Sequence, residues 1–242
     1  MTTKEKREVV IPGEIISTDE NDLPGEWTIK SGNDILSTRL GIVEKQDRLV
    51  KIIPLSGVYI PRRGNTVIGQ IKDIAISGWM VEVGGPYSAF LPLRECPGFV
   101  EESEMESVYG IGDLIVVKIL DIRRTSIDLT MKSREREKGL GKIRDGIVIN
   151  INPHRVPRII GKEGSMIKLI KDASRCIITV GQNGFIWIKG ETLENAIFAR
   201  QAIEFIVENT ISDGLTEKVE KWLNDNKPKG IESSKQSMEE SD

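Results

Sequence analysis

One short segment of the chain combines residue types that can hold a negatively charged ligand. It reads V-P-R-I-I-G-K-E-G-S-M-I-K-L-I over residues 156–170, with Gly161 and Gly164 three positions apart. Neither glycine has a Cβ, so another backbone can approach closely, and the second opens a helical pattern whose first N–H groups face outward. Such a turn can bind phosphates, although a bare G-x-x-G also occurs in plain helix–turn–helix connections. The spacing alone leaves both interpretations open.

Basic residues gather around this turn although the whole chain is acidic. The chain has 34 Lys and Arg against 37 Asp and Glu, which gives a formal net charge of −3. Residues 152–175 instead carry a local charge of +4, from six basic and two acidic side chains: Arg155, Arg158, Lys162, Lys168, Lys171 and Arg175 against Glu163 and Asp172. The sequence therefore predicts a basic face at the turn and excludes a positive field over the whole molecule.

The spacing of Pro and Gly predicts several small domains that must position this turn. The first half is cut into Ile-, Val- and Thr-rich segments of strand length, which indicates all-β structure, and five such segments between residues 64 and 132 predict a small closed barrel. Beyond residue 145 the pattern follows the order βααββα, which is typical of an α+β domain. We expect a β domain at 1–60, a barrel at 61–133, a linker at 134–144, an α+β domain at 145–210, a helix at 211–225 and a disordered tail at 226–242.

The remaining composition excludes several classes of protein. Cys96 and Cys176 lie far apart and the chain has a single His, which excludes a disulfide scaffold and a Cys/His metal cage and suits a reducing cytosol. The apolar runs are too short to span a bilayer. His154 has no acid or nucleophile spaced around it, and the acidic run at residues 101–106 is typical of a solvated loop. We expect a cytoplasmic protein that does not contact a membrane and has no catalytic residue, metal or cofactor.

A longer stretch around the turn resembles a known RNA-binding family. Residues 149–168 read I-x-I-x-P-x-x-V-x-R-I-I-G-K-E-G-x-x-I-K, which resembles the KH domain, and the βααββα order matches its eukaryotic-type topology. In that family the G-x-x-G loop clamps the backbone of about four nucleotides beside an apolar groove, which here implies Ile160 and Ile178 on the groove floor. The RNA-binding residues implied by the resemblance are Gly161, Lys162, Glu163, Gly164, Arg155, Arg158, Lys168 and Lys171. Because Glu163 places a negative charge in the clamp, we expect modest affinity.

The barrel region resembles the S-one type of OB fold. The resemblance rests on V-I-G-Q-I-K-D-I, G-W-M-V-E-V-G, G-D-L-I-V-V-K-I-L-D-I-R-R and I-D-L-T-M-K. OB folds bind nucleic acid at the loops that join strands one to two and four to five. The resemblance places Lys72 in the first of these loops and Arg123 and Arg124 in the second, although two arginines can also simply solvate a turn.

Aromatic side chains are scarce where RNA-binding S-one domains carry them. The matching positions hold Ser77, Met80 and Pro92, so we expect weak and mainly electrostatic binding by the barrel. Trp79 alternates with Val81 and Val83, which predicts that its ring packs in the core.

The order of the three domains resembles the Rrp-four type cap subunit of the archaeal exosome over about residues 9–210. V-V-I-P-G-E, Y-I-P-R-R-G-N-T-V-I-G-Q-I and G-W-M-V-E-V-G-G-P-Y-S-A-F-L-P-L carry this resemblance. In that family three caps sit on a hexameric ring of phosphorolytic subunits and guide single-stranded RNA 3′ ends into the pore for degradation. The resemblance implies a non-catalytic accessory subunit whose β domain at 1–60 docks on the ring. A stand-alone S-one/KH regulator of transcription or translation is the alternative.

Overall fold

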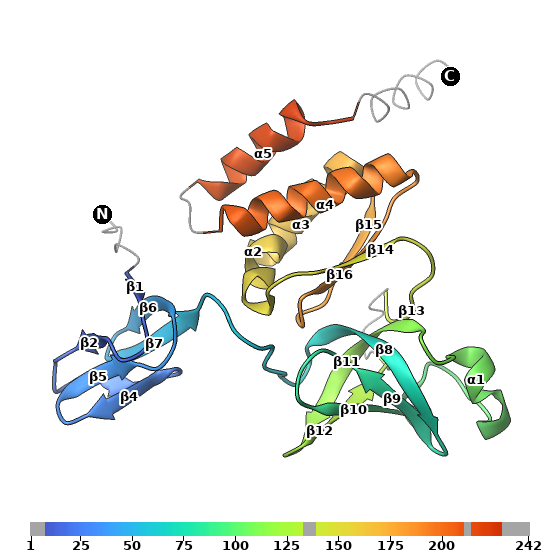
Figure 1. Ribbon diagram of the computed structural model, residues 1–242, viewed down its shortest axis with the longest axis horizontal. Helices are drawn as coiled ribbons and strands as arrows, with labels where there is room; N and C mark the ends of the chain where they lie inside the picture. The colour runs from blue at the N-terminus through green and yellow to red at the C-terminus, as the bar shows by residue number, and fades with distance from the viewer. Residues whose placement is uncertain (1–7, 133–138, 211–213, 229–242) are drawn as a thin grey trace. The chain divides into compact units, whose positions relative to one another are not determined.

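The computed structural model describes residues 8–132, 139–210 and 214–228, and the chain divides into two compact units, Met1–Gly57 and Val58–Asp242 (Figure 1). Residues 229–242, which hold most of the expected tail at 226–242, lie outside the described residues. Of the expected linker at 134–144, only residues 134–138 lie outside them, and residues 141–142 form a short strand.

The first unit consists of two small β-sheets. One sheet has the order β1-β6-β7-β3, formed by β1 (Val9–Val10), β6 (Gly41–Gln46), β7 (Leu49–Pro54) and β3 (Leu23–Pro24). The other has the order β2-β5-β4, formed by β2 (Ile15–Ser17), β5 (Asp34–Ser37) and β4 (Thr28–Ser31). Along β7, Val50 and Ile52 are buried while Leu49 and Ile53 are exposed, as alternation requires. The predicted all-β N-terminal domain is confirmed.

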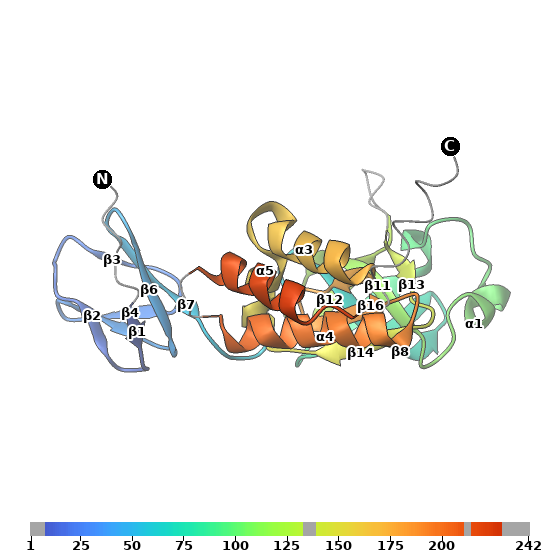
Figure 2. The same cartoon turned by 90° about the horizontal axis from the view of Figure 1, so that it is seen from above.

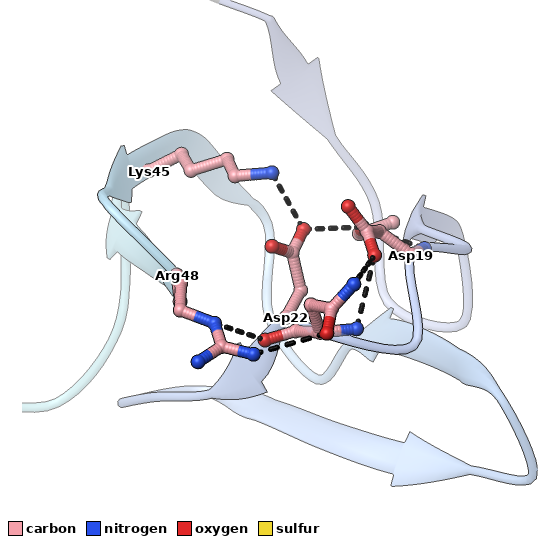
Figure 3. Close-up of polar contacts among 6 residues, drawn as sticks. Asp19, Asp22, Lys45 and Arg48 are labelled. Carbon is pink, nitrogen blue, oxygen red and sulfur yellow. Dashed lines mark hydrogen bonds and ion pairs between the residues drawn. The ribbon is translucent and has the colours of Figure 1, made fainter.

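A buried carboxylate ties the loop after β2 to the β6–β7 hairpin (Figure 3). Asp22 is 2 % exposed; its Oδ2 accepts hydrogen bonds from Lys45 Nζ at 2.7 Å and from Ser17 Oγ at 2.6 Å. Arg48 donates to the backbone oxygen and the side-chain oxygen of Asn21 at 3.1 and 3.0 Å. The hydrogen bonds from Lys45 and then Ser17 hold the pKa of Asp22 below its ordinary value.

The second unit begins with a closed five-stranded barrel. It is formed by β8 (Thr66–Ala75), β9 (Gly78–Glu82), β10 (Ser88–Pro92), β11 (Leu114–Ile122) and β12 (Ser126–Thr130). The strand order is β12-β10-β9-β8-β11, and β12 also pairs with β11, which closes the barrel. The excursion between β10 and β11 contains η1 (Leu93–Glu95), η2 (Glu102–Glu104) and α1 (Met105–Val108). The predicted OB-type barrel is confirmed.

Trp79 fills the centre of this barrel. Its side chain is fully buried, its indole Nε1 donates to the backbone oxygen of Tyr109 at 2.9 Å, and the two rings meet edge to face at 5.3 Å. The predicted core position of Trp79 is confirmed.

The predicted βααββα domain follows and is also confirmed. Its elements are β14 (Ile147–Asn150), η3 (Pro153–Arg155), α2 (Val156–Ile160), η4 (Lys162–Gly164), α3 (Ser165–Ser174), β15 (Ile177–Val180), β16 (Phe185–Lys189) and α4 (Leu193–Glu208). The antiparallel sheet has the order β14-β16-β15. Before it, the short strand β13 (Gly141–Lys142) pairs with β11 of the barrel.

A last helix, α5 (Leu215–Asp225), lies along α4 (Figures 1 and 2). Val219 and Leu223 are buried in the core of the βααββα domain, and the Trp222 ring stacks on Phe198 at 5.8 Å and on Phe205 at 5.4 Å. The helix therefore completes this core. None of the helices in the described ranges is both long and apolar enough to cross a membrane.

Candidate nucleic-acid interface

The G-x-x-G turn joins α2 to α3, and its two glycines serve different purposes. Gly161 ends α2 at φ +73°, and a Cβ there would lie 2.7 Å from both the backbone nitrogen and the Cβ of Met166. Gly164 has φ +78°, but a Cβ there would meet only Ile167, at 3.9 Å. The first position needs glycine for close packing, whereas the second needs it for backbone conformation alone.

The two residues between the glycines face solvent. Lys162 and Glu163 are exposed, and Glu163 takes the left-handed conformation at φ +53°, which non-glycine residues adopt rarely. Because the side chains at the tip lie outside the domain core, the turn is accessible to a ligand.

The basic residues around the turn are not equally available. Lys168 is exposed on α3 and Lys171 is half-buried. Arg158 is also half-buried, and Arg155 Nη1 donates to the backbone oxygen of Val207 at 3.3 Å, in the last turn of α4. Arg155 thus donates a hydrogen bond to a backbone carbonyl at the C-terminal end of α4, where a cation is favourable. Their contact with RNA stays a prediction.

The predicted groove floor is wrong at Ile178, whereas the place of Ile160 in the groove stays a prediction. Ile160 is half-buried at the end of α2, but Ile178 is 2 % exposed and belongs to the domain core. Alternation along β15 explains the error, because Ile178 faces inward while Ile177 is 62 % exposed.

The β15–β16 hairpin connects this domain to the barrel. Strand β9 pairs with β8 only from Gln70 onward, so the first residues of β8 have no β9 partner on that edge. Gln182 and Asn183 occupy it: Gln182 N donates to Thr66 O at 2.8 Å, and Thr66 N donates to Gln182 Oε1 at 2.6 Å. The hairpin turn is therefore hydrogen-bonded to the edge of β8.

Asn183 is the buried centre of this contact. It is 3 % exposed; its Nδ2 donates to the backbone oxygens of Ile68 and Val83, both at 2.7 Å, and its Oδ1 accepts from Ile68 N at 3.3 Å. Sequence reasoning missed Gln182 and Asn183. The two glycines that flank them were the available signal, since G-Q-N-G marks a tight turn but does not show what the turn contacts.

The loop before β9 is shorter than predicted, and the placement of Lys72 in it is wrong. Strand β8 continues to Ala75, so the loop before β9 contains only residues 76–77. Lys72 lies within β8, at the register shift between Ile71 and Asp73, and its Nζ donates to Gln70 Oε1 at 3.0 Å. A β-bulge lets the strand continue past the position where the sequence pattern breaks.

The second loop matches the prediction in position. Arg123 and Arg124 lie in the turn between β11 and β12, and both are exposed. Arg123 Nη2 lies 2.8 Å from Asp128 Oδ2. This ion pair fixes the position of the Arg123 guanidinium.

Phe90 is a further residue that sequence reasoning missed. It pairs with Met80 on β9 and with Asp128 on β12. A Cβ on Gly78 would lie 2.7 Å from Phe90 Cζ, so the ring covers this glycine. The alternation of β10, with Ala89 and Leu91 buried, could have shown that Phe90 points out of the barrel.

Metal and thiol chemistry find little support in the parts of the chain that the structure describes. No group of three or more His, Cys, Asp or Glu side chains there is placed to hold a metal ion. Both cysteines are buried, and burial raises the pKa of Cys96 to about 11 and also raises that of Cys176.

An OB-type barrel bonded to a KH domain with an accessible G-x-x-G turn defines a class of multidomain nucleic-acid-binding protein. Two family models match the chain: the exosome RNA binding protein RRP4 N-terminal domain at residues 7–56 and the KH domain at residues 146–194. Curated relatives are named exosome complex component Rrp4. The protein from Methanobrevibacter smithii is 39 % identical over 90 % of this chain and 72 % of its own length, and that from Methanothermus fervidus is 34 % identical over 90 % and 96 %.

A crystal structure described as an exosome complex RNA-binding protein has 31 % identity and a TM-score of 0.61 and covers 70 % of this chain and 97 % of its own. The chain belongs to the Rrp4 family of exosome components.

Proposed function

We propose that this protein is a non-catalytic cap of an archaeal exosome, which docks on the phosphorolytic ring and guides single-stranded RNA 3′ ends into its pore. Membership of the Rrp4 family supports the assignment to the exosome. The observation that carries the RNA-binding part is the accessible turn at residues 161–164 on a domain that is hydrogen-bonded to an OB-type barrel. We place this activity in the cytoplasm.

The proposed RNA contact begins at the KH turn. Gly161 and Gly164 shape the exposed turn at which the sugar–phosphate backbone is proposed to bind, and Lys162 and Lys168 are exposed cations beside it. Arg155, Arg158 and Lys171 extend the basic face, while Glu163 reduces its charge. On the barrel, Arg123 and Arg124 and the strand residue Lys72 supply further phosphate contacts.

Ring docking is assigned to the first unit because its apolar surface is unusually exposed. Among residues 8–57, five large apolar side chains are buried, whereas eight are exposed: Val9, Ile11, Ile15, Leu23, Ile29, Leu40, Leu49 and Ile53. Exposed apolar surface of this kind marks protein contacts. On the β1-β6-β7 sheet, Val9, Ile42 and Ile53 stand side by side across three strands.

Charge placed on this sheet tests the docking assignment. Val9→Lys with Ile53→Lys should abolish co-purification of the phosphorolytic ring subunits while RNA affinity is unchanged. Ile177→Lys is the matched control, since that side chain is exposed on the KH domain. Retained ring association in the double variant would move the docking surface elsewhere. We also propose that three copies of this chain bind each ring, and the mass of the reconstituted complex tests this number.

The non-catalytic role has its own test. The purified chain should not shorten RNA in the presence of phosphate or divalent metal ions, and degradation should begin only when ring subunits are added. Turnover that follows the pure chain through two different chromatography steps would contradict this role.

A further inference from the structure

The turn between β15 and β16 contains a pair of residues that is chemically labile. Asn183 is followed by Gly184, and this is the single Asn-Gly pair in the chain. In such a pair the backbone nitrogen that follows the asparagine can attack the side-chain amide, because glycine has no Cβ to shield that nitrogen. Asparagine is accordingly counted among the thermolabile residues. The turn therefore contains a bond that can break without an enzyme.

The fold requires both residues of this pair. Asn183 makes the three hydrogen bonds to the barrel backbone at Ile68 and Val83. Gly184 has φ +91°, and a Cβ there would collide with the backbone oxygen of Ile151. Ile151 N also donates to Gly184 O at 2.9 Å, which ties the turn to the end of β14. Because each position needs its own residue, the contact between the KH domain and the barrel keeps the labile pair.

The closed contact holds the reacting groups of Asn183 and Gly184 apart. Both hydrogens of Asn183 Nδ2 are directed at backbone oxygens 2.7 Å away, and the side chain is 3 % exposed. Gly184 N donates to Gly181 O at 3.0 Å, so the attacking nitrogen is occupied as well. The side chain can turn toward this nitrogen only after these bonds break. The rate of reaction should therefore follow the fraction of molecules in which the contact is open.

We infer that Asn183 is a deamidation site, at which a transient opening of the contact between the KH domain and the barrel becomes permanent. In the first step a bond forms between Gly184 N and Asn183 Cγ, and the bond from Cγ to Nδ2 breaks. Ammonia leaves and carries the proton of the Gly184 N–H group. Water then adds across one of the two C–N bonds of the succinimide ring, which gives either aspartate or isoaspartate at this position.

Neither product can restore the contact. Aspartate places a carboxylate, which only accepts hydrogen bonds, against the backbone oxygens of Ile68 and Val83. Isoaspartate adds one carbon to the main chain and displaces Gly184 from its bond to Ile151. The reaction needs water alone and involves neither RNA nor ring subunits, so it can be tested on the purified chain.

The test compares deamidation in the native and the unfolded full chain. Both samples are kept in mildly alkaline buffer, and mass spectrometry of the peptide that contains Asn183 follows the loss of its amide. The native chain should react at least about ten-fold more slowly than the chain in guanidinium chloride. Ser31→Asn is the matched control, because it creates an exposed Asn-Gly pair at the β4–β5 turn, where a Cβ on Gly32 would have no neighbour within 4 Å. That pair should react at close to the unfolded rate in the same native molecules.

Gln182→Ala tests whether the reaction requires the contact to open. It removes the hydrogen bond from Thr66 N and leaves Asn183 and Gly184 in place. Loss of one hydrogen bond should raise the rate at Asn183 by about five-fold, with no change at the Ser31→Asn site. Deamidated chains carry an added negative charge and can be separated by anion exchange. They should unfold at a lower guanidinium chloride concentration than intact chains, as Asn183→Asp should.

Four results would overturn the proposal. Equal rates at Asn183 and at the Ser31→Asn site in the native chain would mean that the contact gives no protection. An unchanged rate in Gln182→Ala would separate the reaction from opening of the contact. Deamidated chains as stable as intact ones would show that the contact forms again, and a lack of reaction at Asn183 in guanidinium chloride would show that the pair is not labile.

Discussion

Asn183→Ala should loosen the contact between the KH domain and the barrel. The wild-type amide makes three hydrogen bonds to barrel backbone, two to Ile68 and one to Val83, from a position that is 3 % exposed. Alanine removes all three and leaves one N–H and two C=O groups without this partner. The cores of the two domains keep their own side chains, so their folds should persist.

The size of the effect follows from those three bonds. A hydrogen bond contributes about 1 kcal/mol net, and a buried polar group left unpaired costs about 1–3 kcal/mol. Water can reach the edge of β8 once the contact loosens, which limits the cost, so we expect a loss of about 3 kcal/mol. This is a large fraction of the roughly 5–15 kcal/mol that stabilises a typical domain.

Guanidinium chloride unfolding of the full chain measures this loss through its tryptophan fluorescence. Two further variants give the expected order. Gln182→Ala loses only the bond from Thr66 N, since its backbone N–H still donates to Thr66 O, and should cost about 1 kcal/mol. Asn183→Asp places a carboxylate against two carbonyl oxygens and should destabilise at least as much as alanine. A change of less than about 0.5 kcal/mol for Asn183→Ala, within the range of ordinary surface substitutions, would refute this reasoning.

Three other predictions concern stability. The pKa of Asp22 is lowered in the folded protein, so its ionised form stabilises the first unit fully above the unfolded-state pKa of about 3.9. This stabilisation is lost as pH falls through the lower folded-state pKa. Urea unfolding across this pH range should show the loss, and Asp22→Asn should remove this acid dependence. Trp222→Ala opens the stack on Phe198 and Phe205, and because Trp222 is only half-buried the loss should be about 2–3 kcal/mol, at or below the low end for core aromatics, measured by thermal unfolding. Gly161→Ala should lower the melting temperature more than Gly164→Ala, since only the first Cβ meets Met166 at 2.7 Å; an equal loss would contradict the packing argument.

The sequence is most informative where one local rule decides the structure. The alternation around Trp79 predicts its burial, and the two glycines at 161 and 164 predict the turn between α2 and α3. The βααββα order follows from periodicity, because each element buries one face against the same core.

Sequence reasoning fails where a distant segment decides the outcome. Lys72 lies in a strand because a bulge keeps β8 paired with β9, and no local pattern marks that bulge. The role of Asn183 depends on the edge of β8, more than a hundred residues earlier in the chain. Ile178 is buried because helices cover its side of the sheet, whereas its neighbour Ile177 is exposed.

RNA affinity as a function of salt tests the central claim, that the KH turn holds the phosphates of single-stranded RNA. Lys162→Asp with Glu163→Asp keeps both glycines, so the packing of Gly161 against Met166 is preserved. The matched control is Glu217→Asp with Lys218→Asp, the same pair of changes at exposed positions on α5.

Contact with three or four phosphates predicts a wild-type slope of about −2 to −3 for log affinity against log salt. The variant in the KH turn should bind at least about ten-fold more weakly, with a slope closer to zero, and the α5 control should match the wild type. Equal affinity and an equal slope in all three proteins would contradict the claim.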